Sequence, residues 1–513
     1  MTVNRFILVT ASLLMCLFAC GGSKGTDPGE TDPTDPGEIT PPTPVFQRYV
    51  KDQNCSSSIL RAHVKYSVYL PAGYENDTEK RYSVVYMLHG LGDDNNSWNG
   101  SYLHANSKIN EWEAKGLSEM IYVFPQGFNS YYCNAYNGSY AYMDMFVQEL
   151  IPLIDKTYRT IPDRQHRAVT GYSMGGFGTI ALAEKHPEMF IASAPLSMSV
   201  RTDWQYKEES QSGWENQWGW IFGGKGQSGD GRITEYYKQH CPLYYFNEEN
   251  RESLSSVHWY LICGDDEKNL LYANDELHCV MAQNGYEHQW RVVNGGHSSS
   301  VWMPALDEVL PMFDHYMNGG TLWNPSYHTE ITPGTVETDA NGAFVSPVYQ
   351  EKHTGTAMLI PYKGLSVSDL KAVMAAIQVS PSFDNGYVLL PCDLSKKDLG
   401  EWMFIWDGLY PSEKKLVLGI GEGAAQAASM PAGTFRRSYY AEAQTGEAPV
   451  VSKGQSIYFA GTDKCPYWWD LNALYNACKN KEAEFEYRVV NGTSDPLTNI
   501  LLSIKAIQPY FYY

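Results

Sequence analysis

The sequence predicts an α/β fold with a mostly parallel sheet covered by helices on both faces, followed by a second, smaller copy of that fold. Three observations predict it. Short apolar stretches alternate with helix-like stretches from residue 47 to about residue 318. A serine flanked by glycines, Ser173, lies at one strand-to-helix junction. The pentapeptide RVVNG occurs twice, from Arg291 and from Arg488, each time after a similar segment.

The first 46 residues have the composition of an export signal and a tether. Arg5 precedes a short apolar run that ends in LFAC at Cys20, which resembles a bacterial lipobox. We expect residues 1–20 to be a lipoprotein signal peptide and Cys20 to be lipidated, the alternative being an ordinary secretory signal. Residues 21–46 are rich in Gly, Pro, Thr and acidic residues, which predicts a disordered tether. The expected location is therefore outside the cytoplasm, anchored at the outer membrane or cell surface.

Composition excludes several functional classes. The formal net charge of −20 argues against a nucleic-acid partner, because phosphate binding requires clustered Lys and Arg. There is no C-x-x-C and no H-E-x-x-H motif, so no metal or other cofactor is expected. Aromatic residues make up 14% of the chain, which suits either sugar or aryl ligands or plain packing.

Strands and helices are expected to alternate along the first domain. Expected strands lie within 65–74, 82–90, 116–127, 166–173, 257–266 and 289–297, and expected helices within 142–158, 176–187, 272–285 and 301–317. The stretch 199–256 breaks this rhythm, since it is rich in Trp, Gly, Gln and Glu, and it is expected to be an insertion. Its tryptophans are expected either to shape an acyl or sugar pocket or to pack on one another; they are Trp204, Trp214, Trp218 and Trp220.

These patterns divide the folded part into two domains. We expect a first domain over 47–318, a linker over 319–332 and a second domain over 333–513. The second domain repeats the order of the first, but it lacks the inserted segment.

Ser173 has the sequence context of a nucleophile. GYSMG fits the pattern G-x-S-x-G between a strand and a helix. The sharp turn holds the hydroxyl above the sheet, and side chains at Gly171 and Gly175 would clash there. The N–H groups at the start of the helix face the same point, where an oxyanion would form.

A base and an acid are expected downstream of the serine. His297 follows a strand and two glycines, in the chain order Ser, acid, His of α/β-hydrolases. The acid is expected in the turn after the strand that ends at Gly264. The candidates are Asp265, Asp266 and Glu267; our choice is Asp266, with Glu267 as the alternative.

The oxyanion hole requires two backbone N–H donors. One is expected from Met174, the residue after the nucleophile. The other is expected from the segment HGLGDD, at Leu91 or alternatively at Gly92.

The segments YSVVYMLHGLGDDNNSW, HRAVTGYSMGGFGTIALAEKHPEMF and GGHSSSVW resemble the esterase D-like family of α/β-hydrolases, with its S-formylglutathione hydrolases, mycolyltransferases and family 1 carbohydrate esterases. The resemblance covers about residues 65–317 and implies Ser173 as nucleophile and His297 as base. The family's acid usually lies three residues after the strand glycine, where this chain has Glu267. Trp302 matches a family aromatic beside the histidine, and with Trp98 it is a candidate for substrate binding.

The resemblance and the expected export together imply a serine esterase. The implied substrates are feruloyl or acetyl esters of plant polysaccharides or oligosaccharides. Two alternatives remain, a glycan-binding lipoprotein with a vestigial esterase fold and a serine peptidase. The second domain has Gly421 in the serine's place, Thr493 or Ser494 in the histidine's place and no histidine after His353, so we expect it to be catalytically degenerate.

Overall fold

A computed structural model describes residues 46–267, 269–324, 329–353, 355–378, 386–412, 414–446 and 449–511. The predicted signal peptide, Cys20 and all of the predicted tether except Phe46 lie outside the described residues, as do residues 325–328 of the predicted linker. Gln47–Tyr513 forms one compact unit. No helix in the described part of the chain has the length and apolarity needed to cross a membrane.

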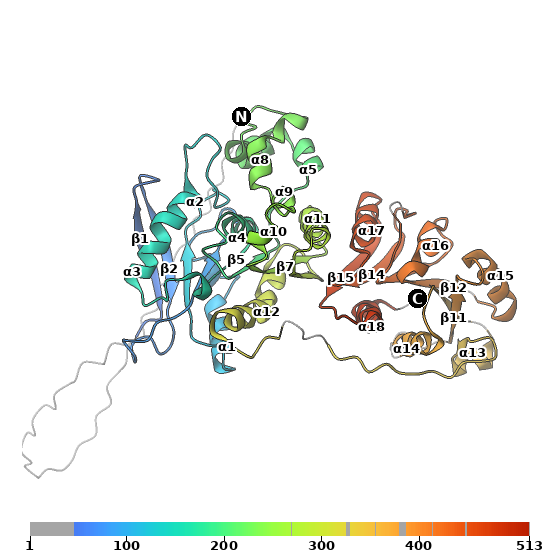
Figure 1. Cartoon of the computed structure of the whole chain (residues 1–513). Coiled ribbons are helices and arrows are strands. Elements are labelled where there is room, and N and C mark those ends of the chain that lie inside the picture. Colours follow the sequence, from blue (N-terminus) through green and yellow to red (C-terminus); the bar gives the residue numbers. More distant parts are fainter. Residues whose placement is uncertain are drawn as a thin grey trace, which may run out of the picture. The chain divides into compact units, whose positions relative to one another are not determined.

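The α/β fold predicted from the sequence is confirmed, and one twisted sheet runs through both predicted domains (Figure 1). Among the described residues its strand order is β1-β2-β4-β3-β5-β6-β7-β8-β15-β14-β13-β12-β10-β11-β9. The strands of the first half are β1 (Tyr49–Ser57), β2 (Ala62–Tyr69), β3 (Val84–Leu88), β4 (Ile121–Pro125), β5 (Arg167–Tyr172), β6 (Ala192–Leu196), β7 (His258–Gly264) and β8 (His288–Val293). Those of the second half are β9 (Phe344–Val345), β10 (Thr356–Tyr362), β11 (Tyr387–Asp393), β12 (Lys414–Ile420), β13 (Arg437–Ala441), β14 (Ser456–Thr462) and β15 (Glu484–Val490).

Helices cover both faces of each half. In the first half they are α1 (Ala105–Ala114), α2 (Tyr142–Met145), α3 (Ile151–Thr157), α4 (Met174–Lys185), α11 (Leu270–Gln283) and α12 (Ser299–Asn318). In the second half they are α13 (Pro347–Lys352), α14 (Val367–Gln378), α15 (Leu399–Leu409), α16 (Ala424–Ser429), α17 (Trp468–Asn480) and α18 (Pro496–Ile507). Outside the segment between β6 and β7, the short 3₁₀ and π segments are η1 (Ser97–Asn99), η2 (Phe146–Leu150), η3 (Arg164–His166), η6 (Gly421–Gly423) and η7 (Gln508–Tyr510).

Each half has its own buried core. In the first half, apolar residues of α1 and α12 pack against the strand side chains of one face, such as Val85 and Met87. In the second half, α14 and α18 pack against Met358, Ile360 and Leu418 in the same manner. Strands such as β3, β5 and β10 are buried over their whole length because helices cover both faces of a parallel sheet.

The second half repeats the topology of the first. Counted outward from the centre of the sheet, β8-β7-β6-β5-β3-β4-β2 corresponds to β15-β14-β13-β12-β10-β11-β9. β2 pairs antiparallel with β4, and β9 pairs antiparallel with β11, so the correspondence extends to strand direction. This is the repetition that the two RVVNG segments predict.

The largest difference between the halves is the segment between β6 and β7. It consists of α5 (Asp203–Glu208), α6 (Gln211–Gly213), η4 (Trp214–Trp218), α7 (Gly219–Phe222), η5 (Gly229–Arg232), α8 (Glu235–His240), α9 (Pro242–Tyr245) and α10 (Arg251–Leu254). Between β13 and β14 the second half has only residues 442–455. The structure therefore has an extra helical segment where the sequence predicts an insertion.

Candidate active site

Ser173 lies in the sharp turn between β5 and α4. Its φ is +58°, a left-handed conformation that costs a non-glycine residue about 1–3 kcal/mol. The turn is this tight because neighbouring backbone approaches closely: a Cβ on Gly175 would lie 2.3 Å from the Leu88 carbonyl oxygen, and one on Gly171 would lie 2.6 Å from the Gly175 carbonyl oxygen. Both glycines are therefore required, as predicted.

His297 lies in the loop between β8 and α12, beside the serine. Its Nε2 is 2.8 Å from Ser173 Oγ. Its Nδ1 is 2.8 Å from a carboxylate oxygen of Glu267, whose side chain is fully buried. Because the carboxylate only accepts, Nδ1–H donates to Glu267, and Nε2 is left to accept the proton of Ser173.

The structure corrects the choice of Asp266 as the acid. Asp266 is exposed, whereas Glu267, the alternative, contacts His297. Glu267 is held inward because its other oxygen accepts hydrogen bonds from the Gly264 N–H at 2.8 Å and from the Ser197 hydroxyl. The third candidate, Asp265, is buried and pairs with Arg488 of the second half.

Trp302 and Trp98 are not available to a substrate, which corrects their assignment as binding residues. Trp302 is 5% exposed and Trp98 is 1% exposed. The Trp302 indole N–H donates to Ser197 Oγ at 2.8 Å, and its ring stacks on Tyr172 and contacts His297 edge-on. Trp302 therefore supports the triad from beneath.

Ser197 is a site residue that sequence reasoning missed. It follows β6, has a φ of +45° and joins Trp302 to Glu267 through its hydroxyl. A serine after a buried strand is too common to indicate this role.

The loop after β3 faces the nucleophile turn and carries the predicted oxyanion donor. Leu91 is 45% exposed, and no hydrogen bond from its N–H is found in the described part of the chain. The alternative, Gly92, already donates its N–H to Asn129 at 3.0 Å, which favours Leu91. The second predicted donor, Met174, is the first residue of α4.

Asp93 ties this loop to the strand that carries Ser173. Its Oδ2 accepts hydrogen bonds from the hydroxyls of Tyr102 and Tyr172, both at 2.7 Å. Burial is the main cause that raises the pKa of Tyr102 to about 12, and the Asp93 charge acts in the same direction. The two phenol hydroxyls both donate to Asp93 and so join the loop after β3 to Tyr172, the last residue of β5 before Ser173.

The inserted helices pack mainly on themselves. Trp214 and Trp218 are fully buried and contact Tyr206 edge-on. Arg232 is also buried and donates to the carbonyl of Tyr206. Trp204 is 51% exposed and Trp220 is partly exposed, and their rings contact Tyr272 and Tyr140 outside the segment. The two buried tryptophans therefore pack the segment, and they do not line an open pocket.

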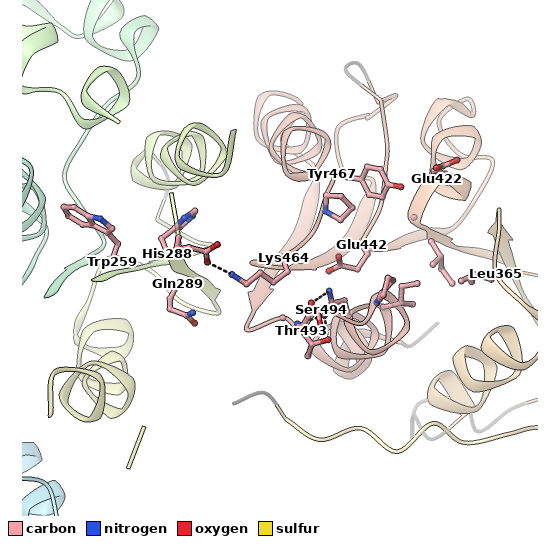
Figure 2. Close-up of a pocket in the computed structure, with 18 of the residues that line it drawn as sticks. Trp259, His288, Gln289, Leu365, Glu422, Glu442, Lys464, Tyr467, Thr493 and Ser494 are labelled. Atoms are coloured by element: carbon pink, nitrogen blue, oxygen red, sulfur yellow. Dashed lines mark hydrogen bonds and ion pairs between the residues drawn. The ribbon is translucent and has the colours of Figure 1, made fainter. Parts of the chain in front are cut away.

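The corresponding place in the second half lacks the triad. Gly421 follows β12 and has a φ of +51°, close to the +58° of Ser173. Ser494, which immediately precedes the N-cap of α18, matches His297, which immediately precedes the N-cap of α12. Gly421 and Ser494 line part of a cavity of about 1060 Å³. Figure 2 shows Ser494 among its lining residues. Ser173 does not line this cavity. The series of contacts from a carboxylate through a histidine to a serine lies instead at Glu267, His297 and Ser173.

The described residues hold no cluster of His, Cys, Asp and Glu side chains arranged to bind a metal ion. Eight cysteines in the described part are buried free thiols: Cys55, Cys133, Cys241, Cys263, Cys279, Cys392, Cys465 and Cys478. Burial raises the pKa of the Cys263 thiol, which makes it a poor nucleophile.

Comparison with known proteins places this arrangement in a family. A family model described as "Putative esterase" matches residues 57–313. An endo-1,4-beta-xylanase/feruloyl esterase of Xylanibacter ruminicola is 32% identical over 133 residues, which are 24% of this chain and 18% of that protein. Endo-1,4-beta-xylanase Y of Acetivibrio thermocellus is 30% identical over 123 residues, 22% of this chain and 11% of that protein. The chain thus matches less than a fifth of the length of these two relatives.

Among solved structures, one titled ferulic acid esterase is 30% identical, with a TM-score of 0.44, and the match covers 53% of this chain and 100% of that one. The family model spans about half of this chain and includes Ser173, Glu267 and His297. The chain therefore belongs to this esterase family, a family of carboxylic ester hydrolases.

Proposed function

We propose that the protein is a serine esterase that removes feruloyl or acetyl groups from polysaccharides or oligosaccharides through an acyl-enzyme. The observation that carries the proposal is the unbroken chain of contacts from Glu267 through His297 to Ser173, with 2.8 Å at each step. These are the distances that a nucleophile and its general base require.

In the proposed mechanism, Ser173 Oγ attacks the ester carbonyl while His297 Nε2 accepts the hydroxyl proton. The resulting oxyanion accepts hydrogen bonds from the N–H groups of Met174 and Leu91. When the intermediate collapses, His297 returns the proton to the departing sugar oxygen, and the acyl group stays on Ser173. Water, deprotonated by His297, then releases the carboxylic acid and restores Ser173. Glu267 keeps the imidazole in the required tautomer and stabilises the imidazolium.

The substrate class is supported by two features. One relative carries the name of a xylanase and feruloyl esterase, and the sequence around Cys20 predicts export with a lipid anchor. An exported esterase meets extracellular polymers rather than cytosolic metabolites. We therefore propose that the substrates are esterified plant polysaccharides and that the enzyme acts on them while anchored to a membrane at Cys20.

The test is hydrolysis by the purified chain from Gly21 onward of methyl ferulate, 4-nitrophenyl acetate and acetylated xylan. We expect turnover on at least one, and the preferred substrate identifies the acyl group. Ser173→Ala should abolish turnover while the thermal midpoint stays near that of the wild type. Turnover that survives this substitution would refute the proposal. Metabolic labelling with a fatty acid, compared with Cys20→Ala, tests the anchor.

A further inference from the structure

Two reciprocal ion pairs join the two halves, and each half supplies one arginine and one aspartate. β8 and β15 pair antiparallel at Val292 and Val489, the first valine of each RVVNG segment. Arg291 on β8 donates to Asp463 of the second half at 3.0 Å. Arg488 on β15 donates to Asp265 of the first half. The side chains in both pairs are at most 10% exposed.

The two aspartates have the same position and the same local contacts. Asp265 follows β7 and accepts the Gly295 N–H at 3.2 Å; Asp463 follows β14 and accepts the Gly492 N–H at 2.8 Å. Each aspartate therefore joins the loop on which it lies to the loop after the neighbouring strand. In each half these are the two loops that, by position, would supply an acid and a base.

The chemistry carried by these loops differs between the halves. In the first half, the loop of Asp265 carries Glu267, and the loop of Gly295 carries His297. At the matching positions of the second half lie Cys465 and Ser494. The pair Arg488–Asp265 therefore reaches the loops that carry Glu267 and His297. The corresponding pair Arg291–Asp463 reaches loops without these residues.

Tyr487, next to Arg488, adds further contacts to the same region. Its backbone N–H donates to Asp265 at 3.2 Å, and its hydroxyl donates to Asp275 of α11 at 3.0 Å. Asn472 of α17 donates to the other oxygen of Asp275 at 2.9 Å. α11 begins three residues after Glu267, so the second half holds both ends of the segment that positions the acid.

We propose that the degenerate half is a positioning module for the active site, and that Arg488 is its central positioning residue. Arg488 holds Asp265, and Asp265 fixes the loops from which Glu267 and His297 meet. Arg488 touches no reacting atom and acts only through Asp265. This inference rests on the proposed esterase function, and it gives the second half a role that does not require a ligand.

The reciprocal ion pairs supply a matched control within the second half. Arg488→Gln removes the pair that reaches the triad loops, and Asp463→Asn removes the pair that reaches Cys465 and Ser494. Both variants leave every residue of the first half unchanged. We expect kcat to fall about 10- to 100-fold in Arg488→Gln, because small displacements of catalytic groups have effects of this size. We expect KM to change little, and kcat of Asp463→Asn to remain within about 3-fold of wild type.

The experiment uses the full chain from Gly21, with kcat and KM on 4-nitrophenyl acetate and thermal midpoints for all variants. Arg488→Lys keeps the charge and should recover part of kcat; it also replaces Arg488→Gln if that variant does not fold. Equal losses of kcat in the Arg488 and Asp463 variants, or full activity in a folded Arg488→Gln, would overturn the inference while leaving the esterase proposal intact. A wild-type chain without turnover on any ester would instead refute the proposed function.

Discussion

Ser173 and Gly421 occupy the same place in the two halves, the turn between a parallel strand and the helix that follows it. Both have a positive φ, +58° and +51°. At the glycine this conformation costs little, whereas at the serine it is strained. The comparison shows that the framework of the turn does not need the nucleophile. In the first half, the strain is tolerated where it holds a hydroxyl 2.8 Å from His297.

The residue that follows β6, and its counterpart after β13, also differ between the halves. After β6 the first half has Ser197, and after β13 the second half has Glu442, both with positive φ. Ser197 donates to Glu267, the proposed acid, which contacts His297. Glu442 itself accepts from the Ser503 hydroxyl at 3.0 Å and from the Thr462 N–H. A buried carboxylate is therefore present in both halves, but in the second it has no histidine to orient.

The largest expected effect comes from giving the first half the residue of the second. Ser173→Gly should lower kcat by about 10⁴-fold or more, because the nucleophile is lost. The same change should leave the free energy of unfolding unchanged or raise it by about 1 kcal/mol, because glycine relieves the strain at this φ. Ester hydrolysis and urea denaturation measure the two quantities.

Gly421→Ser is the reverse change and the control. It should cost about 1–3 kcal/mol of unfolding free energy and should add no activity in the Ser173→Ala background. A stabilised Gly421→Ser variant would contradict the account of strain at this turn.

The next effect separates the two adjacent acids. Glu267→Gln should lower kcat by about 10³- to 10⁴-fold, because the amide no longer holds His297 in the required tautomer. Asp266→Asn, one residue earlier and exposed, should stay within about 2-fold. Steady-state kinetics on one chromogenic ester compares both variants. Equal losses, or a larger loss in Asp266→Asn, would show that the acid has been misassigned.

These two positions show how far the sequence determines the site. The strand-turn-helix context and the flanking glycines predict Ser173 as the nucleophile, and chain order with a turn after a strand predicts His297 as the base. The structure brings these two side chains within hydrogen-bonding distance. The acid was not resolved, because the choice between Asp266 and Glu267 depends on how the turn after β7 closes. The Gly264 N–H and the Ser197 hydroxyl hold Glu267 inward in this turn. No local sequence pattern indicates the contact with Ser197, which is 70 residues away in the chain.

Burial and long-range pairing were also beyond local patterns. Trp98 and Trp302 lie near site residues in the sequence, yet both are buried and closed to a substrate. The RVVNG repeat indicated a duplicated fold, and the structure repeats the strand order. It did not indicate that Arg291 and Arg488 would each pair with an aspartate of the opposite half, because that depends on β8 and β15 meeting antiparallel.

The smallest expected effect concerns the carboxyl of Glu442. Burial raises its pKa from the ordinary 4.5 to about 6, against the opposing effect of hydrogen bonds from Ser503 and Thr462. The folded protein therefore retains this proton at a pH where the unfolded chain has lost it, and stability falls as pH rises from about 4.5 to about 6. The difference corresponds to about 2 kcal/mol.

Glu442→Gln removes the titration, so its stability relative to wild type should increase across this interval and stay constant above it. Urea denaturation from pH 4 to pH 8 measures the increase, with the exposed Glu422→Gln as control. A difference between Glu442→Gln and wild type that does not vary with pH would mean that this carboxyl titrates as it does in the unfolded chain.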